Sequence, residues 1–266
     1  MGIIIAILLF SFIIIFHELG HFLLAKANGI RVDEFSLGLG PTLIGKKIGG
    51  TKFCIKLLPF GGACMMGEDD ADDMSEGSFN SKSVWARISV IAAGPAFNLI
   101  LAWIFCVIII LSVGYRSAEI SSVSEGYSAA EQGMQAGDVI KEINGRNVYI
   151  WDDVSLYTLT HPNETSLEVV YERDGEEYTA VIEPRQLEGD ATPKLGVTSG
   201  EVVKPGLLGA FQYGAYTVRY WINYTFDSLR MLVTGQLGIK DMSGPVGIVS
   251  AVDSVYQAAA PSGIAA

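Results

Sequence analysis

The sequence is poor in cysteine and in charged residues. It has three cysteines and no C-x-x-C pair, so we interpret Cys54, Cys64 and Cys106 as free thiols rather than as metal ligands. Free thiols at Cys54 and Cys64 fit the reducing side of a membrane. Charged residues make up 18% of the chain and hydrophobic residues 50%, and the mean hydropathy is positive. This balance is typical of membrane proteins and not of proteins that are soluble throughout.

Positive charge is scarce in one part of the chain. Residues 26–87 carry eight Lys/Arg and eight Asp/Glu, whereas residues 114–205 carry seven and seventeen, a net −10 of the total −11. An acidic excess of this kind argues against nucleic acid as a partner. The acidic run at 68–76 lacks the glycine and the terminal glutamate of an EF-hand loop, so we interpret it as a solvated loop.

Residues 2–25 form a nearly unbroken apolar run. As a helix they would rise roughly 36 Å, which is enough to cross a hydrocarbon core of about 30 Å. No positively charged segment precedes the run and no A-x-A site follows it, which argues against a secretory signal peptide. The run therefore predicts a membrane span.

Three ionisable residues interrupt this span: His17, Glu18 and His21. Polar groups at such depth each cost about 2.5–3.5 kcal/mol on insertion scales, so they indicate a function. The two histidines are four residues apart and lie on one helix face, where both can bind one zinc ion. Glu18 can then take a proton from a zinc-bound water. The sequence thus predicts a hydrolytic zinc site with His17 and His21 as ligands and Glu18 as general base.

The rest of the chain divides by composition. Residues 88–113 predict a second span that Gly94-Pro95 should kink, and its buried Asn98 serves either as structural glue or as part of the site. Short alternating runs at about 30–67 predict β-hairpins beside the first span. Residues 114–200 predict a soluble β-rich domain with a hairpin turn at Asn144-Gly145.

The last third of the chain is less regular. A third hydrophobic stretch at 207–234 contains Arg219, Asp227 and Arg230, and its tyrosines favour the membrane interface for its first half. The richer supply of Lys/Arg at 26–87 predicts that this segment is cytosolic. The N-terminus and the 114–200 domain would then lie outside, with His17 and His21 in the cytosolic half of the first span.

Several segments together resemble the site-2 protease family of intramembrane zinc metalloproteases, in its bacterial sigma-E-regulator branch. They occur in family order and cover nearly the whole chain. The matching segments are HELGH at 17–21, FSLGLGP at 35–41, LPFGGACMMGE at 58–68, FNSKSVWAR at 79–87, AGPAFN at 93–98 and TGQLGIKDMSGPVGI at 234–248. In addition, SAAEQGMQAGDVIKEING at 128–145 resembles the core of a PDZ domain.

The resemblance implies a polytopic α-helical protein of the bacterial plasma membrane. Such a protein has a membrane-associated β-hairpin region and one inserted PDZ-like domain. It implies that His17 and His21 bind Zn²⁺, that Glu18 is the general base, and that the glycine-rich segment 35–67 holds an unwound substrate by edge pairing. The PDZ-like domain would filter substrates by size. The implied partners are the bilayer and single-span proteins trimmed beforehand, such as anti-sigma factors or remnant signal peptides.

One family motif is missing. The family takes its third zinc ligand from an Asp in a Leu-Asp-Gly motif, which this sequence lacks, and Asp227, Asp241 and Asp253 do not match it. We therefore expect this ligand beyond residue 266. The predicted organisation is a first half of the protease core at 1–113, the extracytoplasmic PDZ-like domain at 114–200, and a third span with a truncated core at 201–266.

Two other functions are compatible with parts of the sequence. A catalytically incomplete membrane protein could use its PDZ-like domain as a binding module. A transporter could use the intramembrane His and Glu to move protons, but the sequence has no internal repeat to support this.

Overall fold

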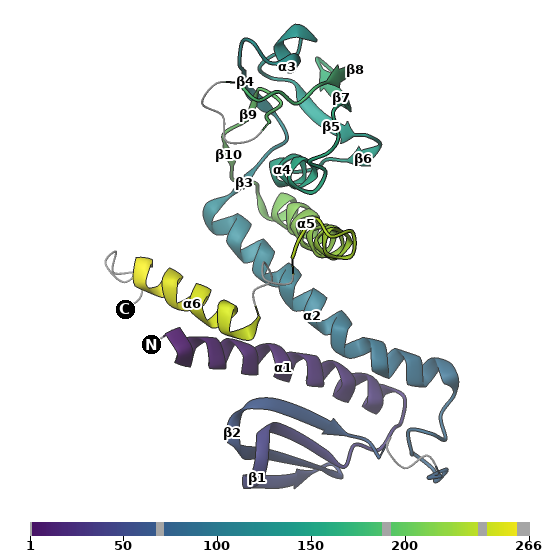
Figure 1. The fold of residues 1–266 in the computed structure, drawn as a ribbon. Helices are drawn as coiled ribbons and strands as arrows, with labels where there is room; N and C mark the ends of the chain where they lie inside the picture. The colour runs from purple at the N-terminus through teal and green to yellow at the C-terminus, as the bar shows by residue number, and fades with distance from the viewer. Residues whose placement is uncertain (1, 68–71, 188–192, 239–243, 260–266) are drawn as a thin grey trace. The chain divides into compact units, whose positions relative to one another are not determined.

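The computed structural model describes residues 2–67, 72–187, 193–238 and 244–259. The chain forms two compact units, one of Met1–Leu101 with Lys240–Ala266 and the other of Ala102–Ile239. Figure 1 shows the helices and strands of both. Helix α2 (Val84–Val113) contributes its first part to one unit and its last part to the other.

Two described helices are long and apolar enough to cross a membrane, as the sequence predicts: α1 (Gly2–Ala27) and α2. Helix α1 ends at Asn28-Gly29, where Gly29 adopts a positive φ of 66° and the Ile30 N–H bonds back to the Ala25 carbonyl at 2.8 Å. This is the usual glycine-based helix end. Many large apolar side chains of both helices are exposed, as expected for helices that face lipid.

The first unit also contains a β element, β1 (Glu34–Ile48) and β2 (Thr51–Met65), which lies in the predicted 30–67 segment. The two strands form a hairpin at Gly49-Gly50, and Glu34–Leu37 is also paired with the last residues of β2. As a result, Leu37 has two partners, Ile55 and Gly62. This arrangement brings the Gly61-Gly62 stretch back beside α1. Helix α6 (Pro245–Ala259) packs against α1 in the same unit.

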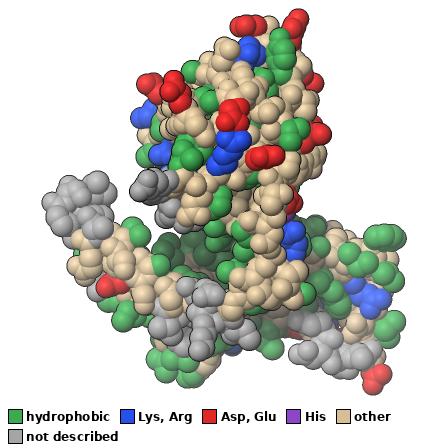
Figure 2. Space-filling view, turned by 45° about the horizontal axis from the view of Figure 1, so that its top comes forward, with side chains coloured by type: hydrophobic (Ala, Val, Ile, Leu, Met, Phe, Trp, Pro, Cys, Tyr) green, Lys and Arg blue, Asp and Glu red, His purple; other side chains and the backbone are tan. Residues whose placement is uncertain are grey.

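The second unit contains the β-rich domain of residues 114–203. Its four-stranded antiparallel sheet has the order β6-β5-β7-β8, and shorter ladders join β4 with β9 and β3 with β10. Figure 2 shows acidic side chains over its surface, in line with its negative charge. The elements are β3 (Tyr115–Arg116), β4 (Ile120–Val123), α3 (Ser128–Glu131), β5 (Val139–Ile143), β6 (Arg146–Asn147), α4 (Trp151–Thr160), β7 (Leu167–Arg173), β8 (Glu176–Ile182), β9 (Val197–Ser199) and β10 (Val202–Val203).

Local sequence explains the hairpins of this domain. Asn144-Gly145 and Asp174-Gly175 both have positive φ at their two residues, which is the geometry of tight hairpin turns. Alternating apolar residues of the strands then share one face and form the core. The most buried of them are Ile120, Ile140, Ile143, Leu167, Val169 and Ile182.

The third hydrophobic stretch forms α5 (Leu207–Val233). Its start packs on α2, where Ala210 is buried with Val107 and Ile110, and its later turns lie against α4. Among the helices that the structure describes, only α1 and α2 meet the length and hydropathy of a span.

A buried ion pair joins the ends of the two central strands of the sheet, β5 and β7. The Asp138 side chain is 1% exposed, and it accepts bonds from Arg173 Nε at 2.7 Å and from Arg173 Nη2 at 2.8 Å. It also accepts the Gln135 N–H at 2.7 Å. The bond to Asp138 raises the pKa of the Arg173 guanidinium above its ordinary value, so the guanidinium stays charged at any physiological pH.

We predict that Asp138→Ala destabilises the β-rich domain by roughly 3 kcal/mol, because it leaves the Arg173 charge without its partner. The change should appear as faster amide hydrogen exchange in β5, β7 and β8. Glu177→Gln, at an exposed carboxylate of β8, is the matched control and should change exchange little. Unaltered protection in Asp138→Ala would contradict this role.

Candidate metal centre

The predicted ligands converge in the first unit. His17 and His21 lie one turn apart on α1, and their Nε2 atoms are 3.2 Å apart. Two nitrogens that each bind a tetrahedral zinc ion at about 2.0–2.1 Å are separated by about 3.3 Å. The pair therefore already has the spacing that one zinc ion needs.

The other ring nitrogen of each histidine has a partner on α2. His21 Nδ1 lies 2.7 Å from the Val90 carbonyl oxygen. Since a carbonyl only accepts hydrogen bonds, His21 Nδ1 carries the proton and Nε2 has a free lone pair. Zinc-binding histidines are commonly oriented by such an outer hydrogen bond.

Asn98 plays the same part for His17. Its Nδ2 lies 3.2 Å from His17 Nδ1, while its Oδ1 is buried without a hydrogen-bond partner. Turning the amide by half a turn places Oδ1 where it accepts the His17 Nδ1–H, and the two orientations differ only in how N and O are assigned. In that orientation both histidines direct their Nε2 lone pairs to the same point. Of the two roles that the sequence leaves open for Asn98, its position favours the one at the site.

Gly94 lets α2 approach the two histidines. A Cβ atom at this position would lie 2.4 Å from His21 Nε2 and 2.5 Å from His17 Nε2, well inside any allowed contact. Gly20 of α1 plays the reciprocal part, because a Cβ there would lie 2.5 Å from the Ala93 carbonyl oxygen. The sequence predicts only a kink at Gly94-Pro95, and the contact of both glycines with the metal centre is evident from the structure alone.

Glu18 faces the β element. A Cβ at Gly62 would lie 3.3 Å from Glu18 Cγ, and Ser11 on α1 donates a hydrogen bond to the Pro59 carbonyl. The last part of β2 therefore runs beside the predicted general base. The carbonyl of Val90 and the glycine at 62 have no signal as site residues in one sequence, because every residue has a carbonyl and glycines are common in turns.

A third ligand is not found in the part of the chain that the structure describes. No group of three His, Cys, Asp or Glu side chains there could hold a metal ion. Asp227 bonds to Arg146 in the second unit, Asp253 lies on α6, and Asp241 is outside the described residues. Two imidazoles with fixed tautomers fit the zinc chemistry that the sequence predicts but do not complete it.

Comparison with known proteins assigns the family. The sequence profile of peptidase family M50 matches residues 5–266. The chain belongs to this family. The predicted family and enzyme class, a zinc metalloprotease of the site-2 protease type, are therefore confirmed, whereas the roles of His17, Glu18 and His21 stay predictions.

Family relatives cover most of the chain. A Clostridium acetobutylicum protein is 34% identical over 97% of this chain and 76% of its own length. The zinc metalloprotease RasP of Bacillus licheniformis is 30% identical, and the regulator of sigma-W protease RasP of Bacillus subtilis is 28% identical; each comparison covers 94% of this chain and 79% of the relative. The names of the relatives agree with the predicted zinc cofactor.

A solved structure is similar to part of the chain. The PDZ domain of the SdrC-like protein from Listeria monocytogenes is 25% identical, covers 33% of this chain and 90% of its own, and has a TM-score of 0.28.

We predict that Gly94→Ala removes most of the zinc, because its Cβ would push the two imidazoles apart. Metal content of the purified chain, measured by elemental analysis, should fall as far as it does in His17→Ala. Gly206→Ala, where an added Cβ meets nothing within 4 Å, should retain zinc. A Gly94→Ala protein with full zinc content would refute the close approach.

Proposed function

We propose that this protein is an intramembrane zinc metalloprotease that cleaves single-span membrane proteins after prior trimming. The observation that carries the proposal is the pair of Nε2 atoms, 3.2 Å apart on an apolar helix. A preformed pair of imidazoles in such a helix has no structural purpose that would offset its insertion cost.

The chemistry divides among few residues. His17 and His21 hold Zn²⁺, which when bound supplies a Lewis acid that polarises the scissile carbonyl and makes water acidic near neutral pH. Glu18 accepts a proton from the attacking water at its carboxylate and returns it to the leaving amine. The Val90 carbonyl and the Asn98 amide accept hydrogen bonds from the Nδ1–H groups of His21 and His17, so both Nε2 atoms stay unprotonated and available to the metal.

The β element presents the substrate. A peptide bond within a helix is shielded by its own hydrogen bonds, so a transmembrane substrate must unwind before water can reach it. Gly61 and Gly62 have no side chains to hold a partner strand away from Glu18, and Gly62 belongs to a paired strand of the β element. We infer that the unwound substrate adds as a strand here, with its backbone beside the general base.

The proposed location is the bacterial plasma membrane, with α1 and α2 both spanning the bilayer and the chain therefore multi-pass. The eight Lys/Arg of residues 26–87 support a cytosolic β element, and the acidic β-rich domain of residues 114–203 would then lie outside. There it would act as a size filter that admits trimmed proteins only, such as anti-sigma factors or remnant signal peptides. The bilayer, not nucleic acid, is the expected partner.

A binding module is the second candidate function. The observation in its favour is the absence of a third ligand among the described residues. A chain that bound partner tails through its β-rich domain would need no complete zinc site.

We predict that Glu18→Gln retains zinc and loses cleavage of a trimmed single-span substrate by 10²–10⁴-fold, a typical range for loss of a general base. The substitution is nearly isosteric and removes only the proton acceptor. Zinc content and cleavage in proteoliposomes would be measured on the same preparation. Equal turnover by the wild-type chain and Glu18→Gln would contradict the protease, and substrate capture without cleavage by both would support the binding module.

Asn98 gives a further prediction for this centre. Asn98→Leu should weaken zinc binding about 10–100-fold, the usual cost of losing an outer partner of a ligand. Asn98→Asp should restore binding, because a carboxylate oxygen accepts the His17 Nδ1–H. The measurement is competition against a zinc chelator in detergent. If Asn98→Asp bound zinc as poorly as Asn98→Leu while both proteins remained folded, Asn98 would not orient His17.

A further inference from the structure

We propose that α5 lies flat in the membrane interface on the side of the β-rich domain, instead of spanning the bilayer. One side of the helix is bonded to the β-rich domain and the remaining apolar side is immersed in lipid. This inference concerns the second unit alone and does not depend on the zinc site.

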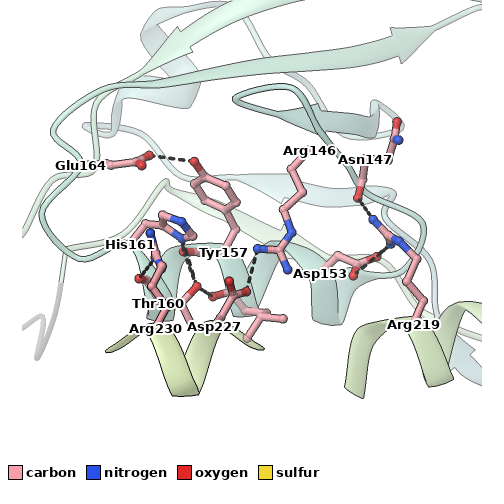
Figure 3. Close-up of polar contacts among 11 residues, drawn as sticks. Arg146, Asn147, Asp153, Tyr157, Thr160, His161, Glu164, Arg219, Asp227 and Arg230 are labelled. Atoms are coloured by element: carbon pink, nitrogen blue, oxygen red, sulfur yellow. Dashed lines mark hydrogen bonds and ion pairs between the residues drawn. The ribbon is translucent and has the colours of Figure 1, made fainter. Parts of the chain in front are cut away.

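All three charged residues of α5 bond to the β-rich domain (Figure 3). The Asp227 carboxylate accepts a hydrogen bond from Arg146 Nη1 at 2.7 Å, and this pair is mostly buried. Arg219 donates to the Asn147 carbonyl at 2.8 Å and lies 3.4 Å from Asp153. Arg230 donates to the Thr160 carbonyl at 2.9 Å. The polar residues that interrupt the hydrophobic stretch thus have partners in the domain.

These contacts occupy too much of the helix for it to cross a membrane. They begin with the ring of Tyr216, stacked 4.1 Å from that of Tyr149, and end at Arg230, fourteen residues later. At 1.5 Å per residue the contacts extend over about 21 Å of a helix about 40 Å long. The remaining length, about 19 Å, is shorter than a hydrocarbon core of about 30 Å.

One stripe along α5 is apolar and exposed. Leu208, Phe226 and Val233 are 85%, 68% and 86% exposed, and no charged residue of α5 lies among them. Its large members are Leu208, Phe211, Ile222, Phe226, Leu229 and Val233. Successive residues of this set are three, four or eleven residues apart in the sequence. Three or four residues make about one helical turn and eleven make about three turns, so all of them lie on one stripe of the helix.

Continuity with α2 identifies lipid as the occupant. Trp103 Nε1 of α2 donates to the Phe211 carbonyl at 3.0 Å, and Ala210 packs on Val107 and Ile110. These α2 residues lie within the last three turns of a candidate span, so we infer that α5 begins near the depth where that span would leave the hydrocarbon. The apolar stripe therefore continues the exposed surface of α2, on which Ile104 and Ile108 also lie.

Aromatic residues support this placement. Tyr220, Trp221 and Tyr224 form a cluster with ring centroids 5.3–6.3 Å apart. Tyrosine and tryptophan concentrate at the boundary between headgroups and hydrocarbon because their rings have a polar end and an apolar body. A helix with one charged side held by protein and an aromatic, apolar remainder is the type that lies in the interface plane.

The test measures the depth of α5 in the whole chain. Cys54, Cys64 and Cys106 are replaced by alanine, and single cysteines at Leu208, Ile222, Phe226 and Val233 carry a nitroxide label. The chain is reconstituted in vesicles of phosphatidylcholine and phosphatidylglycerol. Relaxation by oxygen and by a water-soluble agent then gives the depth of each label. Ile104 and Ile108 of α2 are membrane controls, and Glu177 of β8 is the solvent control.

We expect all four α5 labels to be accessible to oxygen at one shallow depth, within a few ångströms of one another. A spanning helix would instead change depth by about 37 Å between Leu208 and Val233, and that result would overturn the proposal. Labels shielded from both agents would show that protein covers the stripe. Labels as accessible to the water-soluble agent as the label at Glu177 would show that the stripe lies in water. Either result would also overturn it.

A second measurement tests the bond that holds the helix. Labels at Glu177 and Leu229 give a distance distribution between the β-rich domain and α5. Arg146→Glu, which opposes two carboxylates, should broaden this distribution, and Arg146→Glu combined with Asp227→Arg should narrow it again. A distribution that Arg146→Glu leaves unchanged would show that the ion pair does not hold α5 to the domain.

Discussion

The close approach of α2 to α1 is the constraint on which the candidate site depends. Gly20 and Gly94 leave no side chain between the two helices, and the backbone of α2 reaches the imidazoles of α1. This contact supplies the Val90 carbonyl and the Asn98 amide to the two Nδ1 atoms. Without it, His17 and His21 would rotate freely in an apolar surrounding, and two unsatisfied imidazoles would destabilise the helix in the membrane.

The same constraint explains the composition of the first unit. Small residues at a helix contact permit backbone approach and strong packing where lipid offers no hydrophobic driving force. The β element then covers Glu18 from another direction, using Gly62 in the same way. Gly94 of α2 and Gly62 of β2 therefore mark the two directions from which the chain approaches the polar residues of α1.

In the second unit, charge has the corresponding role. The β-rich domain has a conventional apolar core, yet its attachment to α5 relies on guanidinium and carboxylate groups at Arg146, Arg219 and Asp227. Such bonds are directional and tolerate little sliding, whereas an apolar contact would leave the helix free to shift along the domain. These bonds also explain why Arg219 and Asp227 interrupt a stretch that is otherwise hydrophobic in the sequence.

The sequence by itself determined the family, the two apolar helices, the β-hairpins with their glycine turns, and the spacing of His17, Glu18 and His21. All of these follow from local periodicity or from short motifs, which one stretch of chain contains completely. The tertiary structure decided what local pattern cannot express: that Asn98 lies at His17 rather than in helix packing, that Gly62 lies at Glu18, and that Asp227 pairs with Arg146. Each of these contacts joins residues that are far apart in the chain. Which residues meet depends on how the helices and strands of the whole unit pack, and a local sequence pattern does not contain that information.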